Sequence, residues 1–304
     1  MRTAVECLPC FLRQAARVAK IAGCESPVRE KVVQTVASLI ATMNLNSSPP
    51  ANAEGIYAAI HRESGCLDPY GDIKKRSNEQ ALAVVTGIEA EFGGAPIPLA
   101  TALRLAIAGN AIDYGAFAAP EIASTLAASR TATLAVDHSD LLQRRLDSLR
   151  AGDRVLYLAD NCGEIVYDRL LVASLASRGL AVTVAVKEGP IINDALAEDA
   201  LAAGLDRWAA IVSNGSRCPG TVLERCSPEF RRLFDSAALV LAKGQGNFES
   251  LSQPGREVFF LLLLKCRVAA AHMASLLGRH PDDLPGRGEM AVYCSKESIK
   301  RGTS

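Results

Sequence analysis

Two carboxylates and an amide lie within five residues in the segment Asp160-Asn161-Cys162-Gly163-Glu164. The segment directly follows an apolar run at 155–159, of the kind found in a buried parallel strand, and helical spacing resumes at Ile165. Ligands of open α/β sheets bind outside the carboxyl ends of the strands. Asp160 and Asn161 offer hard oxygen donors, which Mg²⁺ and Mn²⁺ prefer. Taken alone, the same residues also fit an Asp-Asn turn with a helix cap.

Polar residues also follow three other strand-like runs, at 182–186, 210–212 and 239–242. The carboxyl ends of parallel strands lie along one edge of a sheet, so these clusters can converge on a single pocket. Asp194 would then join Asp160 and Asn161 as a third oxygen ligand. This donor set favours Mn²⁺ or Mg²⁺ over Zn²⁺, with Ni²⁺ and Co²⁺ as alternatives.

Lys243 precedes the turn Gly244-Gln245-Gly246-Asn247, and an ammonium beside exposed backbone N–H groups can bind a phosphate. A metal, a lysine and amide donors meet the needs of phosphoryl transfer, which are positioning and charge neutralisation. The metal can also acidify a bound water, and Glu164 or Asp160 can orient that water. The alternative is a solvated loop lysine beside an ordinary glycine turn. No Walker loop or dinucleotide fingerprint is present.

The first half of the chain contributes two weaker motifs. Asn110 and Asp113 interrupt an apolar helical pattern, and we expect them to face the pocket, although a loop is the alternative. Cys7 and Cys10 have Cys-x-x-Cys spacing, but no second pair completes a tetrahedral zinc site. We interpret these cysteines as half-buried thiols at the start of a helix.

The periodicity of apolar residues changes near residue 150. Before it the pattern is helical, and from Arg154 strand-like runs alternate with helical stretches, which predicts βαβ units and a parallel sheet. We therefore predict a helical domain at 1–150 and an α/β domain at 151–304. Within the second domain the pattern predicts helices at 164–177, 193–203 and 219–234, a long helix from Pro254 to Leu277, and an edge strand at 290–294.

Composition excludes several classes of protein. Lys plus Arg and Asp plus Glu each number 33, with no basic run, so the charge pattern of a nucleic-acid-binding protein is absent. The most apolar run, 258–264, is too short to span a bilayer. Nine irregularly spaced cysteines and an N-terminus without an apolar signal core indicate free thiols in a reducing cytoplasm. We expect no nucleic-acid or membrane partner, and the oligomeric state stays open.

Together these residues resemble the metal-dependent damage-control phosphatases, also known as protein family of unknown function 89. The resemblance covers nearly the whole chain, and the paired N-terminal cysteines are similar to those of its prokaryotic branch. The motifs that carry it are Glu6-Cys7-x-Pro9-Cys10, Gly109-Asn110-x-x-Asp113, Asp160-Asn161-x-Gly163-Glu164, Pro190-x-x-Asn193-Asp194 and Lys243-Gly244-Gln245-Gly246-Asn247-Phe248-Glu249.

The resemblance implies a helical domain packed on a three-layer α/β/α (Rossmann-like) domain. It implies a divalent metal held by Asp160, Asn161 and Asp194, with phosphate contacts from Lys243 and the turn after it. Lys265 matches only the lysine of the Arg-Thr-x-Lys motif of eukaryotic relatives, so we expect it to reach the phosphate.

The expected reaction is hydrolysis of phosphate monoesters of small metabolites, such as sugar phosphates or damaged phosphometabolites. Two alternatives are a carboxyl methyltransferase that uses S-adenosylmethionine, an activity attached to one relative, and a non-catalytic phosphometabolite-binding protein. A methyltransferase would need a nucleoside pocket, and the sequence has no glycine-rich first loop to form one.

Overall fold

A computed structural model of the chain describes residues 1–304 except 94, 96, 112–118, 254 and 297–304. Its helices are α1 (Cys7–Ile21), α2 (Ser26–Ala41), α3 (Pro49–Ser64), α4 (Gly71–Glu91), α5 (Leu99–Ala108), α6 (Ala119–Ser129), α7 (Ser139–Asp147), α8 (Glu164–Ala176), α9 (Ala197–Ala202), α10 (Pro228–Ser236), α11 (Gly244–Leu251) and α12 (Arg267–Leu276). Its strands are β1 (Val136–Asp137), β2 (Arg154–Leu158), β3 (Ala181–Val186), β4 (Ala210–Ser213), β5 (Leu239–Lys243), β6 (Phe259–Leu264) and β7 (Glu289–Cys294).

The strands form one seven-stranded sheet in the order β1-β7-β6-β5-β2-β3-β4. All neighbouring pairs are parallel except β6 and β7. In the centre, Val155 of β2 is in register with Val182 of β3 on one side and Leu239 of β5 on the other. The carboxyl ends of five consecutive parallel strands, from β6 to β4, therefore share one edge. The predicted mostly parallel α/β fold is confirmed.

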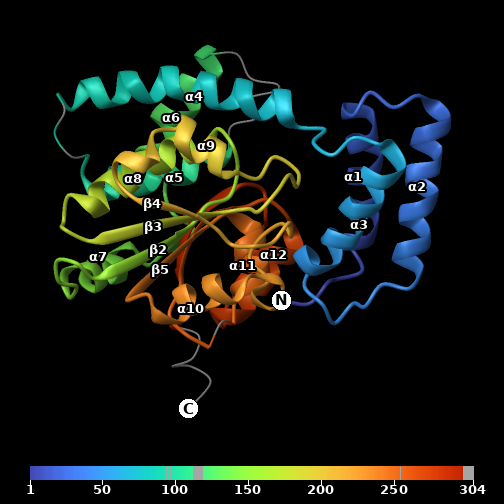
Figure 1. Ribbon diagram of the computed structural model, residues 1–304. Coiled ribbons are helices and arrows are strands. Elements are labelled where there is room, and N and C mark those ends of the chain that lie inside the picture. The colour runs from blue at the N-terminus through green and yellow to red at the C-terminus, as the bar shows by residue number, and fades with distance from the viewer. Residues whose placement is uncertain (94, 96, 112–118, 254, 297–304) are drawn as a thin grey trace.

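The sheet is buried on both faces because alternate residues of its strands enter two separate hydrophobic cores. In β2, Val155 and Tyr157 pack in the core shared with α4, α5 and α8, whereas Leu156 and Leu158 pack in the core shared with α10, α11 and α12. The sheet and the helices packed on its two faces therefore form three layers. Figure 1 shows the sheet between these two groups of helices, with α4 crossing above α8.

Helices α1, α2 and α3 form a separate bundle to the right of the sheet in Figure 1. They have their own core of Ala, Val and Ile side chains with Phe11 and Tyr57, and Ile191 of the α/β part joins it. The side chain of Ser48 accepts a hydrogen bond from the N–H of Ala51 and caps α3, while Gly65 ends that helix with a φ of 68°. The bundle contacts the rest of the protein through α3 and α11.

The domain boundary that we expected at residue 150 stays a prediction, but the hydrophobic core does not change there. Apolar residues of α4, α5 and α7 belong to the same core as the sheet. In addition, β1 precedes residue 150 and pairs with β7.

The long helix predicted from Pro254 to Leu277 is wrong. Residues 259–264 form β6, a strand that is buried along its whole length, and only Arg267–Leu276 is helical. An apolar run without a polar face gives no period, and its leucines favoured the helix. The helix expected at 219–234 begins only at Pro228, and the one expected at 193–203 begins at Ala197. Strand β7 exists, but it lies between β6 and β1 rather than at the edge.

None of the helices in the described part of the chain combines the length and the apolar character needed to cross a membrane.

Candidate active site

The loops after β2 and β3 are joined to each other at the carboxyl edge of the sheet. An isolated antiparallel bridge pairs Asn161 with Asp194. The N–H of Ala195 donates to the carbonyl of Asp160 at 2.8 Å, and the N–H of Cys162 donates to the carbonyl of Asn193 at 2.9 Å. The three residues expected to bind a metal are therefore brought together by backbone pairing between two loops: Asp160, Asn161 and Asp194. The bridged pair, Asn161 and Asp194, is 33 positions apart in the sequence.

The carboxylate of Asp160 is held by two amides. The side-chain nitrogens of Asn110 and Asn161 donate to its Oδ2 at 2.9 and 2.6 Å. The same two nitrogens also donate to Oε2 of Glu164. Because the nitrogen of Asn161 makes these hydrogen bonds, its amide oxygen remains available to bind a cation.

Glycine is required at position 244, where α11 begins beside Asp160. The φ of Gly244 is +77°, and a Cβ added there would lie 1.9 Å from Oδ2 of Asp160. Any side chain at this position would displace the carboxylate. The glycine therefore allows Asp160 to lie against the start of α11.

Lys243 lies in a fully buried cluster of charges behind Asp160. Its Nζ donates to Oε1 of Glu164 at 2.5 Å, to Oδ1 of Asp168 at 2.6 Å and to the carbonyl of Ala106 at 2.8 Å. The hydroxyl of Tyr157 donates to the same Oδ1 of Asp168 at 2.8 Å. Glu164 and Asp168 are one turn apart on α8, so both can face the end of β5. The cluster fixes Glu164 through one of its oxygens.

The pKa values of this region reflect two carboxylates that share one cation. Burial raises the pKa of Asp168 to about 7, although Lys243 opposes the shift. Burial alone would lower the pKa of Lys243, but Asp168 and Glu164 outweigh it, so the pKa is raised and the ammonium stays charged. The pKa of Asp160 is raised well above its usual range, first by burial and then by the charges of Glu164 and Asp194. Such carboxyls bind a proton or a cation readily.

One carboxylate oxygen of Asp194 forms an ion pair but no hydrogen bond with another described residue. Its Oδ2 is buried, has no hydrogen-bond partner among the described residues and lies 3.6 Å from Nζ of Lys187. That ammonium donates to the carbonyl of Gly220. Burial raises the pKa of Asp194 to about 6, against the opposing charge of Lys187. A buried carboxylate oxygen without a donor is the kind of atom that a metal ion can satisfy.

No group of three or more His, Cys, Asp or Glu side chains is arranged to hold a metal ion within the described residues. The expected set has only two carboxylates and the amide of Asn161, so it does not meet that definition. The residues nevertheless fit a hard cation, because they provide oxygen ligands, and the buried Oδ2 of Asp194 accepts no hydrogen bond among the described residues.

A cavity of about 990 Å³ opens above these residues, between the helical bundle and the sheet edge. Asn110, Asn161 and Asn193 line it from the sheet side. Lys265 also lines it, and its expected contact with a phosphate stays a prediction. Ile192 borders this cavity and a neighbouring one, and its φ of 45° is an uncommon conformation for a β-branched residue.

Other expected residues lie elsewhere. Lys243 and Asn247 are fully buried and do not line the cavity, and Asn247 donates to the carbonyls of Ala159 and Lys243. Gly246 lines the neighbouring cavity of about 800 Å³, which Cys7 and Cys10 also line. Asp113 lies outside the described residues.

Two residues that shape the site were not expected in it from the sequence. Asp168 could have been found from its position four residues after Glu164 on one helix. Asn78 of α4 accepts from the N–H of Gly163 at 2.7 Å and donates to Asp199 at 2.8 Å, so it fixes the loop after β2. The four-residue spacing of Lys74 and Asn78 puts them on one helix face, and solvent exposure was the default expectation for that face. That expectation is wrong, because both side chains are buried.

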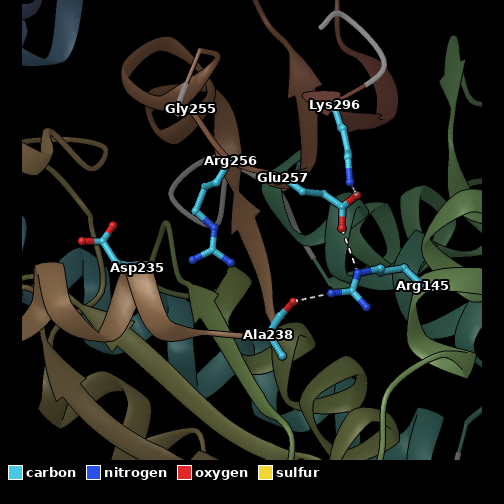
Figure 2. Close-up of a pocket in the computed structure, with 7 residues that line it drawn as sticks. All are labelled: Arg145, Asp235, Ala238, Gly255, Arg256, Glu257 and Lys296. Carbon is cyan, nitrogen blue, oxygen red and sulfur yellow. Dashed lines mark hydrogen bonds and ion pairs between the residues drawn. The ribbon is translucent and has the colours of Figure 1, made fainter. Parts of the chain in front are cut away.

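Another cavity, of about 420 Å³, lies at the opposite edge of the sheet (Figure 2). There Glu257 accepts from Arg145 at 2.9 Å and lies 3.9 Å from Nζ of Lys296, so its charge is neutralised. Arg145 also donates to the carbonyl of Ala238 at 2.8 Å, just before β5 begins. These contacts tie α7 to the amino ends of the strands.

Comparison with known proteins places this arrangement in a family. The family model described as "Damage-control phosphatase ARMT1-like domain" matches residues 3–279. The chain belongs to this family. It is 33% identical over 277 residues to the damage-control phosphatase PH1575 of Pyrococcus horikoshii, a match that covers 90% of this chain and 94% of that one. A damage-control phosphatase of Archaeoglobus fulgidus is 30% identical, with 91% and 97% covered.

A crystal structure of the Pyrococcus protein, described as a member of the family of unknown function 89, superimposes with a TM-score of 0.86. The match has 31% sequence identity and covers 96% of this chain and 98% of that one. The family resemblance and the α/β fold with a helical N-terminal part are thus confirmed.

Proposed function

We propose that this protein is a divalent-metal-dependent phosphatase that hydrolyses phosphate monoesters of small metabolites. Membership of the damage-control phosphatase family supports phosphatase activity. The observation that carries the proposal is the backbone bridge between Asn161 and Asp194, beside Asp160 and under a cavity that Lys265 and three other cationic side chains line. Oxygen ligands next to positive charge are what a metal and a phosphate need together.

Asp160, Asn161 and Asp194 are the residues that would hold the metal. When bound, Mn²⁺ or Mg²⁺ would neutralise phosphate charge and supply an acidified water as nucleophile. Ni²⁺ and Co²⁺ are the alternative ions for the same donors. The raised pKa values of Asp160 and Asp194 mean that protons compete with the metal, so loading is expected to improve as the pH rises.

Glu164 is the group proposed to orient the attacking water. Lys243 and Asn110 both hold its carboxylate, so the side chain enters the reaction in a fixed position. Lys243 is therefore proposed to position Glu164 and not to contact the phosphate itself. Lys265 and Asn110, which line the cavity, are proposed to make the direct phosphate contacts.

A phosphate-release assay tests this proposal. Wild-type protein with Mn²⁺ is expected to release phosphate from p-nitrophenyl phosphate, and chelation is expected to stop the reaction. Asp160→Asn and Asp194→Asn should each reduce the rate by more than about a hundredfold, because each removes a charged ligand. Glu257→Gln, at the opposite edge of the sheet, is the matched control and should keep the wild-type rate.

The alternatives predict other outcomes. A methyltransferase would bind S-adenosylmethionine without added metal and release no phosphate. A non-catalytic binding protein would bind metal and phosphometabolite without turnover. Metal-dependent release that is unchanged in both Asp variants would contradict the proposed ligands.

A further inference from the structure

The cavity above the candidate active site is lined by four cationic side chains and no carboxylate within the described residues. All four are exposed: Arg17, Lys20, Lys265 and Arg287. None of them forms an ion pair with the described part of the chain. Surface cations are commonly paired or dispersed, so four unpaired cations around one cavity indicate an anionic ligand.

The four cations exceed what one phosphate needs. Among the described residues, the proposed metal ligands and the charged cluster behind them comprise four carboxylates and two ammonium groups: Asp160, Glu164, Asp168, Asp194, Lys187 and Lys243. Their formal charges leave two negative charges, which a divalent metal would neutralise. A phosphate monoester brings about two negative charges at neutral pH. Two of the four wall cations would then have no partner in a complex with a simple phosphate ester.

The cations divide into two groups by position. Lys265 follows β6 at the carboxyl edge and lines the cavity together with Asn161, next to Asp160 in the chain. Arg17 and Lys20 instead belong to α1, on the opposite wall, and their spacing of three residues puts them on one helix face. The cavity therefore has one cationic region beside the metal ligands and another across from it.

We propose that the substrate carries a second anionic group, a carboxylate or a second phosphate, which Arg17 and Lys20 bind while the scissile phosphate lies at Asp160 and Lys265. This inference rests on the proposed phosphatase function and narrows its substrate class to phosphorylated acids and bisphosphates. Such a ligand would bridge α1 and the sheet edge, so both parts of the chain contribute to specificity.

Matched substrates that differ only in the second anion test the proposal. Phosphate release from 3-phosphoglycerate is compared with release from glycerol 3-phosphate, and fructose 1,6-bisphosphate with fructose 6-phosphate. We expect kcat/KM to be at least about tenfold higher for the member with the second anion, the effect of one charge-assisted hydrogen bond. Whichever pair shows the larger ratio identifies carboxylate or phosphate as the second group.

The variants Arg17→Gln and Lys20→Gln then locate the binding site. Each should lower the ratio of kcat/KM within the preferred pair by about tenfold, mainly through KM, and high salt should lower it further. Lys75→Gln on α4 is the control, because Lys75 is exposed and lines none of the cavities described here. Its ratio should match that of the wild type.

The outcomes separate this inference from the function it rests on. Equal kcat/KM within both pairs, with phosphate still released, overturns the second-anion site and leaves the phosphatase intact. Release from no probe defeats the proposed function. Calorimetric titration with 3-phosphoglycerate then decides the second-anion site, which is supported if Arg17→Gln weakens binding and overturned if binding is unchanged.

Discussion

Replacing Lys243 by methionine is expected to destabilise the protein strongly, because the substitution leaves two buried carboxylates without their cation. Nζ of Lys243 lies 2.5 Å from Glu164 and 2.6 Å from Asp168, and all three side chains are at most 1% exposed. Removing one partner from a buried ion pair costs about 3–5 kcal/mol. At about 2–4 °C per kcal/mol for a domain of this size class, the melting temperature should fall by roughly 10 °C.

Thermal unfolding followed by circular dichroism at two pH values is the assay. In Lys243→Met, a proton on Asp168, whose pKa burial raises to about 7, can replace the lost cation, so the loss should be smaller at about pH 5 than at about pH 8. Adding Asp168→Asn to the variant should recover part of the stability, since one uncompensated charge is removed. A melting temperature within about 2 °C of the wild type at both pH values would refute the reasoning.

Three further substitutions test separate features. Burial raises the pKa of Glu249 to about 7, so between about pH 4 and pH 7 the native state holds a proton that the unfolded state lacks. The contribution of protonated Glu249 to the free energy of unfolding is fully present below about pH 4 and is lost as the pH rises through about 7. Glu249→Gln should therefore raise the melting temperature at about pH 8 and not at about pH 5, and an equal shift at both would contradict the assignment. Gly244→Ala should cost at least about 1–2 kcal/mol in denaturant unfolding and nearly all activity, because its Cβ would lie 1.9 Å from Asp160. Gly87→Ala, in a helix with nothing within 4 Å, should instead add about 0.5–1 kcal/mol, and equal effects would exclude the clash. Asn78→Ala leaves a buried backbone N–H without its acceptor and should cost about 1–3 kcal/mol, whereas a change below about 0.5 kcal/mol would exclude that contact as a support of the site.

The central strands could be predicted from the sequence because each is a short apolar run bounded by polar residues. Strands β2, β3, β4 and β5 lie within one residue of the predicted runs. Strand β6 could not be recognised in this way, since its six residues are all apolar and only two residues separate it from α12. Periodicity distinguishes strand from helix only when one face is polar.

The part of the candidate site that lies at the carboxyl ends of the strands could be predicted from the sequence. Asp160, Asn161 and Asp194 follow the ends of neighbouring strands, and a parallel sheet brings such residues together. The burial of Lys243 was not predictable, because it depends on α8 turning Glu164 and Asp168 toward the end of β5. A lysine beside glycines in sequence reads as an exposed loop residue.

The cationic side chains that line the cavity also could not be predicted from the sequence. Arg17 and Lys20 are ordinary exposed residues of an amphipathic helix, and only the packing of the helical bundle beside the sheet edge directs them to the cavity. Packing between parts of a chain leaves no local pattern in either part.

The most direct test of the metal site is a titration of the metal-free protein with Mn²⁺, followed by electron paramagnetic resonance of the free ion. We predict one site per chain in the wild type, and a loss of affinity of about 10–100-fold or more in both Asp160→Asn and Asp194→Asn. Melting temperatures of the metal-free variants would show that each still folds. Unchanged Mn²⁺ affinity and stoichiometry in both folded variants would contradict the site.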